Sequence, residues 1–313
     1  MKNFILIGAA GYIANRHFKA IKDTGNNLIA AMDVNDSVGI MDSYFPNAEF
    51  FTEFEQFTTF VNDQIINGTK IDFVSICSPN YLHFPQMKWA LSQGIDVICE
   101  KPLVLHAAEL EMLKTYEQRY KAKIFSILQL RLHSSIKQLK HKLDPIADKQ
   151  CSDVRLTYIT SRGKWYSKSW KGDEKKSGGI SANIGVHFFD MLCHIFGDPI
   201  ENEVHLNSEK KAAGLLKFSN ANIEWFLSID SKDLPQNYVA GEKLTYRSIT
   251  INEEELEFSS GFTELHTDSY KEILEGKGYN LDDNFNAISI VENIRSSTIE
   301  DKPKRYHPML KNL

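Results

Sequence analysis

The sequence lacks any apolar run long enough to span a membrane. Its first residues, Met1-Lys2-Asn3-Phe4, lead directly into a short apolar run that is typical of a strand and not of a secretory signal. We therefore expect no association with a membrane. We expect the protein to be cytoplasmic.

Cysteine is scarce and scattered along the chain. The four cysteines are Cys77, Cys99, Cys151 and Cys193, and no two of them form a Cys-x-x-Cys pair. This spacing indicates neither a disulfide framework nor a structural zinc site, so we expect no metal. We interpret all four as small side chains that are buried or half-buried.

The sequence also lacks a run of basic residues interleaved with aromatic residues. The net charge is -5 and the isoelectric point is near 6.1, so nucleic acid is not an expected partner. A hydrophobic content of 42% with 25% charged residues is typical of a globular protein and excludes disordered and fibrous classes. The length of 313 residues exceeds one comfortable core and predicts two domains.

The amino-terminal half alternates short apolar runs with segments of helical spacing. Strands are predicted at 4–7, 28–32, 48–51, 71–77, 95–99 and 123–129, with helices at 53–68, 82–94 and 107–120. Repeated βα units of this length predict a doubly wound parallel sheet, and we assign residues 1–130 to a Rossmann domain. In such a sheet, ligands bind beyond the carboxyl ends of the strands.

A turn rich in small residues follows the first strand. It reads Gly-x-x-Gly-x-x-Ala from Gly8, which lets the backbone approach a pyrophosphate at the start of a helix. Asp33 ends the second strand, where a carboxylate accepts both ribose hydroxyls of an adenosine and repels a 2′-phosphate. NAD is therefore favoured over NADP. A plain strand-to-helix turn, with Asp33 capping the next helix, is the alternative.

The loop after the fifth strand, Glu100-Lys101-Pro102, places a lysine at the rim of the same crevice. Polar residues also follow the fourth and sixth strands, and a solvated lysine is the alternative interpretation of Lys101. The predicted cofactor-binding residues are Gly8, Gly11, Tyr12, Ile13, Asp33, Asn35, Ser78, Asn80, His83, Glu100, Lys101 and Gln129.

The pattern changes after Asp144-Pro145. Alternating strands are predicted at 154–160, 200–206, 214–218, 223–229, 244–251 and 256–258, with helices at 180–196, 264–276 and 283–300. Strands with one wet face predict a largely antiparallel open sheet. We assign residues 131–313 to a second α+β domain for substrate binding and oligomerisation, whose final helices have the option of packing back on the first domain.

Asn183 and His187 are four residues apart on a predicted helix and share one face. A histidine is the natural base for a hydroxyl that loses its proton as hydride leaves. The alternative is a histidine satisfied within a domain interface. The preceding loop, residues 161–173, combines cations with aromatic rings, which favours an anionic substrate over a plain surface loop.

The Glu-Lys-Pro loop after the fifth strand and the Asn-x-x-x-His helix together resemble the glucose-fructose oxidoreductase and inositol dehydrogenase family. A narrower likeness is to the UDP-N-acetylglucosaminuronate 3-dehydrogenases of lipopolysaccharide O-antigen biosynthesis. That likeness rests on Gly-Ala-Ala-Gly-Tyr-Ile-Ala at 8–14, Arg-Gly-Lys-Trp-Tyr at 162–166, Ser-Trp-Lys-Gly-Asp at 169–173, Asn-Ile-Gly-Val-His-Phe-Phe-Asp at 183–190 and Leu-His-Thr-Asp-Ser-Tyr at 265–270.

The resemblance implies oxidation of the C3 hydroxyl of the nucleotide sugar by NAD. It pairs His187 as general base with Lys101 as the cation that steadies the oxygen, and the two roles are exchangeable. Asn183 would hold the sugar. Arg131, Lys164 and Tyr166 are our candidates for the uronate and diphosphate.

The resemblance further implies a homo-oligomer, either a dimer or a tetramer. Two alternatives remain: an NAD(P)-dependent dehydrogenase of another sugar or inositol, and a non-catalytic dinucleotide sensor. Relatives in the narrow group recycle their cofactor with 2-oxoglutarate, and no residue of this sequence decides that property.

Overall fold

The computed structural model describes residues 1–143, 151–259 and 261–312. The chain forms two compact units, of which unit 1 comprises Met1–Gln129 with Thr263–Phe285. Unit 2 comprises Leu130–Phe262 with Asn286–Leu313. The change of pattern expected at Asp144-Pro145 lies outside the described residues. Each unit is described by itself below.

Unit 1 is built on a parallel sheet of six strands in the order β3-β2-β1-β4-β5-β6. Every neighbouring pair in this sheet is parallel, so the predicted doubly wound sheet is confirmed. The strands are β1 (Asn3–Ile7), β2 (Asn27–Met32), β3 (Glu49–Phe51), β4 (Phe73–Ile76), β5 (Asp96–Cys99) and β6 (Ile124–Ser126).

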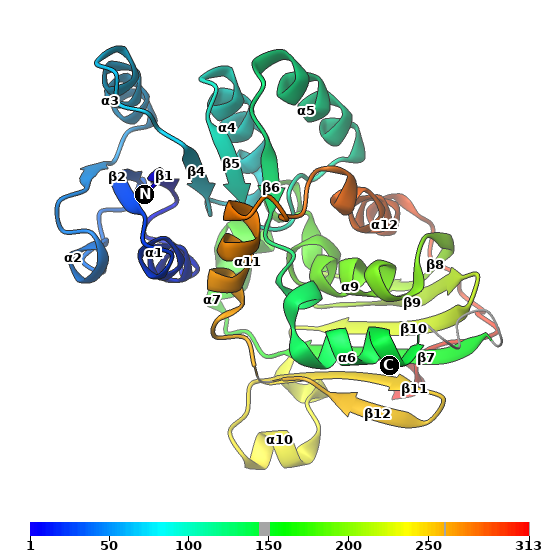
Figure 1. The fold of residues 1–313 in the computed structure, drawn as a ribbon. Helices are drawn as coiled ribbons and strands as arrows, with labels where there is room; N and C mark the ends of the chain where they lie inside the picture. Colours follow the sequence, from blue (N-terminus) through cyan, green and yellow to red (C-terminus); the bar gives the residue numbers. More distant parts are fainter. Residues whose placement is uncertain (144–150, 260, 313) are drawn as a thin grey trace. The chain divides into compact units, whose positions relative to one another are not determined.

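Alternate side chains of β1 serve the two faces of this sheet. Phe4 and Leu6 join one buried cluster with residues of helices α1 and α11, while Ile5 and Ile7 are buried on the opposite face. Figure 1 shows α4 and α5 packed together on one side of the sheet. The helices of unit 1 are α1 (Ala14–Asp23), α2 (Met41–Tyr44), α3 (Phe54–Ile66), α4 (Asn80–Ser92), α5 (Ala107–Tyr120) and α11 (Leu265–Leu274).

Unit 2 contains a second six-stranded sheet, in the order β12-β11-β7-β10-β9-β8. The pair β7 and β10 is parallel, and the other pairs are antiparallel. The sheet is therefore largely antiparallel, as predicted. Its strands are β7 (Ser152–Thr160), β8 (Pro199–Asn207), β9 (Lys211–Phe218), β10 (Ala221–Ser228), β11 (Thr245–Ile251) and β12 (Glu254–Glu257).

Both faces of the central strand β10 are covered. Trp225 meets Phe189 of helix α9 edge-on, with 5.2 Å between ring centroids. The next residue, Phe226, points to the opposite face and stacks on His307 at 5.4 Å. Helices of unit 2 in Figure 1 are α6 (Ser134–Leu143), α7 (Trp165–Lys168), α8 (Glu174–Ser177), α9 (Val186–Phe196), α10 (Gln236–Ala240) and α12 (Phe285–Ser296), which begins at the last residue of unit 1.

Several local predictions need correction. Cys151 is exposed, whereas all four cysteines were expected to be buried or half-buried, and helix α6 was not expected. The helix expected over 180–196 begins with a π-helical turn, Ser181–Gly185, before α9 starts at Val186. The short helices α2, α7, α8 and α10 were not expected, because one turn of helix leaves no periodic signal in a sequence. Across the described ranges, no helix combines the length and the apolar character that crossing a membrane requires.

Candidate active site

The loop between β1 and α1 requires a glycine at its first position. Gly8 has a φ angle of +98°, which favours glycine, and a Cβ built there would lie 2.6 Å from the main chain of Cys77 and Ser78. The loop therefore runs directly against the end of β4. This close approach leaves a shallow backbone cradle at the carboxyl ends of the strands.

The amide hydrogens of this cradle fall into two groups. Those of Gly8 and Ala9 donate to the carbonyl of Met32, so they are used within the sheet. In the described part of the chain, the amides of Tyr12 and Ile13 donate to no protein acceptor. They lie at the amino end of α1, where a helix attracts negative charge. Tyr12 itself is 92% exposed.

Asp33 ties the end of β2 to the same loop. Its Oδ2 atom accepts from the amide of Ala10 at 2.9 Å, and its Oδ1 atom accepts from the amide of Asn35 at 2.9 Å. The carboxylate is thereby held at the rim of the cradle. Asn35 is exposed, and its own Oδ1 atom accepts from the amide of Ser37 at 2.9 Å.

His83 braces two strand-end loops of unit 1. Its ring is fully buried, with Nδ1 lying 2.8 Å from the carbonyl oxygen of Pro102 and Nε2 lying 2.9 Å from that of Ser78. Burial lowers the pKa of His83, against the opposing effect of the two carbonyls. Both ring nitrogens thus face the main chain, so the ring connects the loop after β4 to the loop after β5 that contains Lys101 and Pro102.

Three more predicted cofactor residues lie at these strand ends. Ser78 donates to Oε1 of Gln86 at 2.6 Å, and Asn80 is buried at the first turn of α4. The Oε1 atom of Gln129 is buried and has no protein partner within the described ranges. An unpartnered buried acceptor after β6 is suited to an amide donor from a ligand.

Glu100 is a buried carboxylate immediately before Lys101. Its Oε1 atom lies 3.2 Å from Nε2 of His17 and 2.8 Å from Nε2 of His266, while its Oε2 atom accepts from the Lys101 amide at 3.2 Å. Although burial opposes it, these hydrogen bonds from His17 and His266 hold the pKa of Glu100 well below its usual range. Glu100 is therefore ionised and anchored inside unit 1.

In unit 2, Asn183 and Tyr166 form a direct pair. The side-chain amide of Asn183 donates to the hydroxyl of Tyr166. Tyr166 is buried, with 4% of its surface exposed. Burial raises the pKa of Tyr166, so the phenol stays neutral at physiological pH. Sequence reasoning placed both residues at the substrate, and the structure brings them together within one unit.

The π-helical turn presents Asn183 in a tightly packed setting. A Cβ on Gly185 would lie 2.5 Å from Cδ1 of Leu227 and 2.9 Å from Cε2 of Phe189, so this turn sits close to β10. π-Helical turns occur frequently at functional sites. His187 follows on the first turn of α9 and is half-buried.

Arg131 has a partner inside unit 2, and its contact with the substrate stays a prediction. It is 9% exposed, and its Nε and Nη2 atoms donate to the carboxylate of Asp190 at 3.1 and 2.7 Å. This two-pronged ion pair already balances the charge of Arg131 within unit 2. Lys164, by contrast, is exposed beside Trp165, which is 55% exposed.

Each unit thus collects its own part of the predicted site. In unit 1, Gly8, Asp33, His83 and Glu100 all lie at or behind the carboxyl ends of the strands. In unit 2, the pairing joins Asn183 to Tyr166. The meeting of Lys101 with His187 stays a prediction.

Sequence reasoning assigned no role to His17, Ser75, His266 or Tyr270. These four surround Glu100 or one another through hydrogen bonds inside unit 1. A signal was present, because His266 and Tyr270 are four apart on one helix and therefore share a face. The sequence offered no means of placing that helix beside α1.

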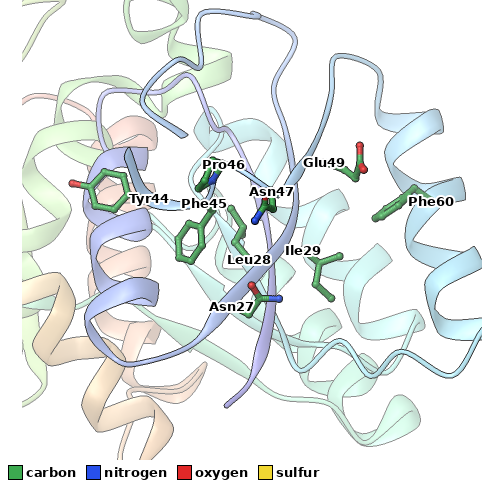
Figure 2. A pocket seen from close by; sticks show the side chains of 10 residues that line it. Asn27, Leu28, Ile29, Tyr44, Phe45, Pro46, Asn47, Glu49 and Phe60 are labelled. Carbon is green, nitrogen blue, oxygen red and sulfur yellow. The ribbon is translucent and has the colours of Figure 1, made fainter. Parts of the chain in front are cut away.

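The hollow in Figure 2 lies elsewhere on unit 1. It has a volume of about 390 Å³ and is lined by Asn27, Leu28 and Ile29, by residues 44–49 and by Phe60. Asn27 begins β2, whereas Asp33 follows its carboxyl end. The hollow therefore lies at the amino ends of the strands, whereas the glycine-rich cradle lies at their carboxyl ends.

The chain belongs to an oxidoreductase family defined by two domains. Residues 2–127 match its NAD-binding Rossmann fold, and residues 152–299 match its C-terminal alpha/beta domain. Among solved structures, the chain is similar to the WlbA (WbpB) dehydrogenase from Thermus thermophilus, with 46% identity and a TM-score of 0.95. This match covers 98% of this chain and 99% of that one. That protein was solved with NAD and UDP-GlcNAcA, and also with NAD and alpha-ketoglutarate.

Curated relatives are more distant. The glucose-6-phosphate 3-dehydrogenase of Bacillus subtilis is 25% identical over 201 residues, covering 63% of this chain and 54% of that protein. The D-glucoside 3-dehydrogenase of Escherichia coli is 24% identical and is covered over 58% of its length. The chain spans about half the length of these relatives. The predicted fold class and oxidoreductase family are confirmed.

Proposed function

We propose that the protein is an NAD-dependent dehydrogenase that oxidises the C3 hydroxyl of UDP-N-acetylglucosaminuronate to a 3-keto sugar. The observation that carries this proposal is the 46% identity, over nearly the full length of both chains, to a dehydrogenase solved with NAD and UDP-GlcNAcA. The distant sugar and inositol dehydrogenases support only the broader class.

The cradle of unit 1 fits a dinucleotide. Gly8 keeps the loop low enough for a pyrophosphate, and the amides of Tyr12 and Ile13 supply donors to it. Asp33 would accept from the adenosine ribose and exclude a 2′-phosphate, which favours NAD. When bound, the nicotinamide accepts the hydride from the sugar carbon. The Oε1 atom of Gln129 would accept from its carboxamide.

The chain supplies the proton chemistry through two side chains. His187 takes the proton of the C3 hydroxyl, and Lys101 stabilises negative charge that develops on the same oxygen. The reverse assignment remains open, with Lys101 as base and His187 as donor. The two assignments predict different pH dependences for the corresponding single variants.

Asn183, held by Tyr166, orients the sugar ring in this proposal. Lys164, which is exposed on its loop, is assigned to the anionic groups of the substrate, and Arg131, which pairs with Asp190, stays a second candidate. Trp165 offers an exposed ring beside it for stacking.

We further place the protein in the cytoplasm, in the assembly of lipopolysaccharide O-antigen sugars, and as a dimer or tetramer. Three large apolar side chains of unit 2, Ile200, Val239 and Leu244, are 71%, 58% and 64% exposed, which is compatible with burial against another copy. Light scattering on the purified protein measures the oligomeric state directly.

The test of function is NAD reduction by the purified protein with a panel of substrates. UDP-N-acetylglucosaminuronate is expected to reduce NAD and to yield a product two hydrogens lighter, whereas UDP-N-acetylglucosamine, without the carboxylate, is expected to react poorly. Turnover of myo-inositol with no turnover of the uronate would identify a polyol, and not the nucleotide sugar, as the substrate. NAD binding without turnover of any member would favour a sensor.

A further inference from the structure

A buried chain of hydrogen bonds runs through unit 1 behind the Lys101 loop. Oγ of Ser75 lies 2.6 Å from the Tyr270 hydroxyl, and this hydroxyl lies 2.8 Å from Nδ1 of His17. Nε2 of His17 and Nε2 of His266 both reach Oε1 of Glu100. All five residues are at most 7% exposed, so water has little part in this network.

The charge of Glu100 fixes the direction of the hydrogen bonds that it receives. An ionised Glu100 only accepts, so both histidines donate to it through Nε2. Nδ1 of His17 continues the chain to the hydroxyls of Tyr270 and Ser75, each of which can both donate and accept. The amide of Lys101 completes the set by donating to Oε2 of Glu100.

His17, Glu100 and His266 also have the composition of a metal site. Their ligand atoms all lie within 4.8 Å of one another. A metal on both Nε2 atoms would move the proton of each ring to Nδ1. For His266, that would leave a buried N–H donor without a protein partner among the described residues, because nothing accepts at its Nδ1. In the hydrogen-bonded arrangement, Nδ1 of His266 is an unused acceptor, and burying an unused acceptor costs less free energy than burying an unused donor.

We propose that His266, His17 and Tyr270 are positioning residues that act through Glu100 to hold the Lys101 loop in its reactive place. The proposal rests on the proposed function, in which Lys101 acts at the reacting oxygen. Helices α1 and α11 hold Oε1 of Glu100, and its Oε2 holds the amide of the next residue. The carboxylate is thereby unable to rotate without breaking a bond at one end.

The loop needs such a brace because it leaves the sheet at this point. The amide of Glu100 still bonds to the carbonyl of Ile76, which continues the sheet ladder. After it, the Lys101 amide relies on the Glu100 side chain. A shift of about 1 Å in a reacting group can lower a rate by about 100-fold, so a modest loosening of this loop has a large kinetic effect.

The decisive comparison is between two substitutions of His266. In His266→Gln, the side-chain amide can occupy the position of Nε2–H and keep donating to Glu100. In His266→Asn, the shorter side chain cannot reach. We expect His266→Gln to stay within about threefold of the wild type in kcat and His266→Asn to fall by about 10- to 100-fold, each with the KM for NAD little changed.

Tyr270→Phe probes the far end of the chain. It removes the hydroxyl that orients His17, and we expect kcat to fall by about three- to tenfold. Tyr44→Phe is the matched control, because Tyr44 packs on Phe18 in the same unit without joining this network. It is expected to leave kcat unchanged.

A second measurement needs no substrate. Hydrogen exchange in the peptide spanning residues 95–105 reports protection of the Lys101 amide. It should become faster in His266→Asn and stay near the wild-type rate in His266→Gln. If the proposed reaction fails, this comparison still decides the role of the network.

Equal kinetics and equal exchange in the two His266 variants would overturn the proposal and leave the histidine a packing residue. Metal analysis of the purified protein provides another decisive outcome. One equivalent of bound zinc or another divalent ion, lost in both His266→Asn and His17→Asn, would replace the hydrogen-bonded node with a metal centre.

Discussion

Nε2 of His266 lies 2.8 Å from Oε1 of Glu100, although 166 residues separate the two in the chain. Helix α11, which carries His266, follows the strands of unit 2 in sequence and yet belongs to unit 1. The residue preceding Lys101 is therefore held by a segment from the carboxy-terminal part of the chain. Truncation before α11 would remove this support.

The glycine-rich cradle gives the first prediction. Gly8→Ala places a Cβ where the main chain of Cys77 and Ser78 already lies, so NAD affinity should fall by at least tenfold and stability by about 1–3 kcal/mol. Calorimetric titration with NAD measures the affinity. Gly39→Ala is the control, since its Cβ would meet no atom within 4 Å. Unchanged affinity in Gly8→Ala would exclude this loop as the pyrophosphate site.

Asp33 should decide the choice between the two dinucleotides. Asp33→Ala removes the carboxylate that repels a 2′-phosphate, so the ratio of kcat/KM for NAD to that for NADP is expected to fall by about tenfold or more. Because the same change removes the bond to the Ala10 amide, activity with NAD should also drop. A preserved ratio would place the adenosine ribose elsewhere.

Lys101 and His187 should each be essential for turnover. Lys101→Met and His187→Asn are expected to lower kcat by about 100-fold or more, the usual size of a general acid–base contribution. Thermal unfolding of both variants serves as the control for folding. Wild-type turnover in either variant would break the assignment of that residue.

The ion pair of Arg131 and Asp190 should matter for stability. Arg131→Met leaves Asp190 buried without its cation, which is expected to cost about 3–5 kcal/mol. Arg155→Met is the control, because Arg155 is 44% exposed and its partner Glu224 keeps a second cation, Arg305. Thermal unfolding compares the two variants. Equal midpoints would show that this ion pair contributes little to stability.

His307 predicts a loss of stability in acid. Burial lowers its pKa to about 3, with Arg155 adding to the effect, and its Nδ1 atom accepts from the Met309 amide. Above pH 6.5 the ring of His307 is neutral in both the folded and the unfolded chain, so it adds no pH dependence to the stability. As the pH falls below 6.5 toward 3, the unfolded chain binds a proton that the fold excludes, so stability drops by about 1.4 kcal/mol per pH unit.

His307→Asn tests this dependence. Asparagine keeps an acceptor for the Met309 amide but does not titrate. The acid limb of its unfolding free energy should be shallower than that of the wild type between pH 6 and 4 by about 1 kcal/mol per pH unit. Parallel curves for the two proteins would assign the acid sensitivity to other groups.

Much of the fold could be predicted because its signals are local. Apolar runs of four or five residues mark β1 and β2, mostly apolar segments mark β4 and β5, and the glycine-rich turn with Asp33 marks the dinucleotide cradle. The start of the helix after residue 180 was placed correctly, but its first turn is π-helical. Periodicity cannot distinguish the two kinds of turn over five residues.

From the sequence alone, the order of the strands, the oxidoreductase likeness and the residues that can do proton chemistry could be predicted. Only the tertiary structure decided which distant side chains meet. In the folded chain, Arg131 pairs with Asp190, β7 lies parallel to β10, and both His17 and His266 contact Glu100. The physical reason is that the periodicity of apolar residues, which predicts helices and strands, depends on residues that are close together in the sequence. The partner of a buried charge is chosen by how whole elements pack, and no local pattern records that choice.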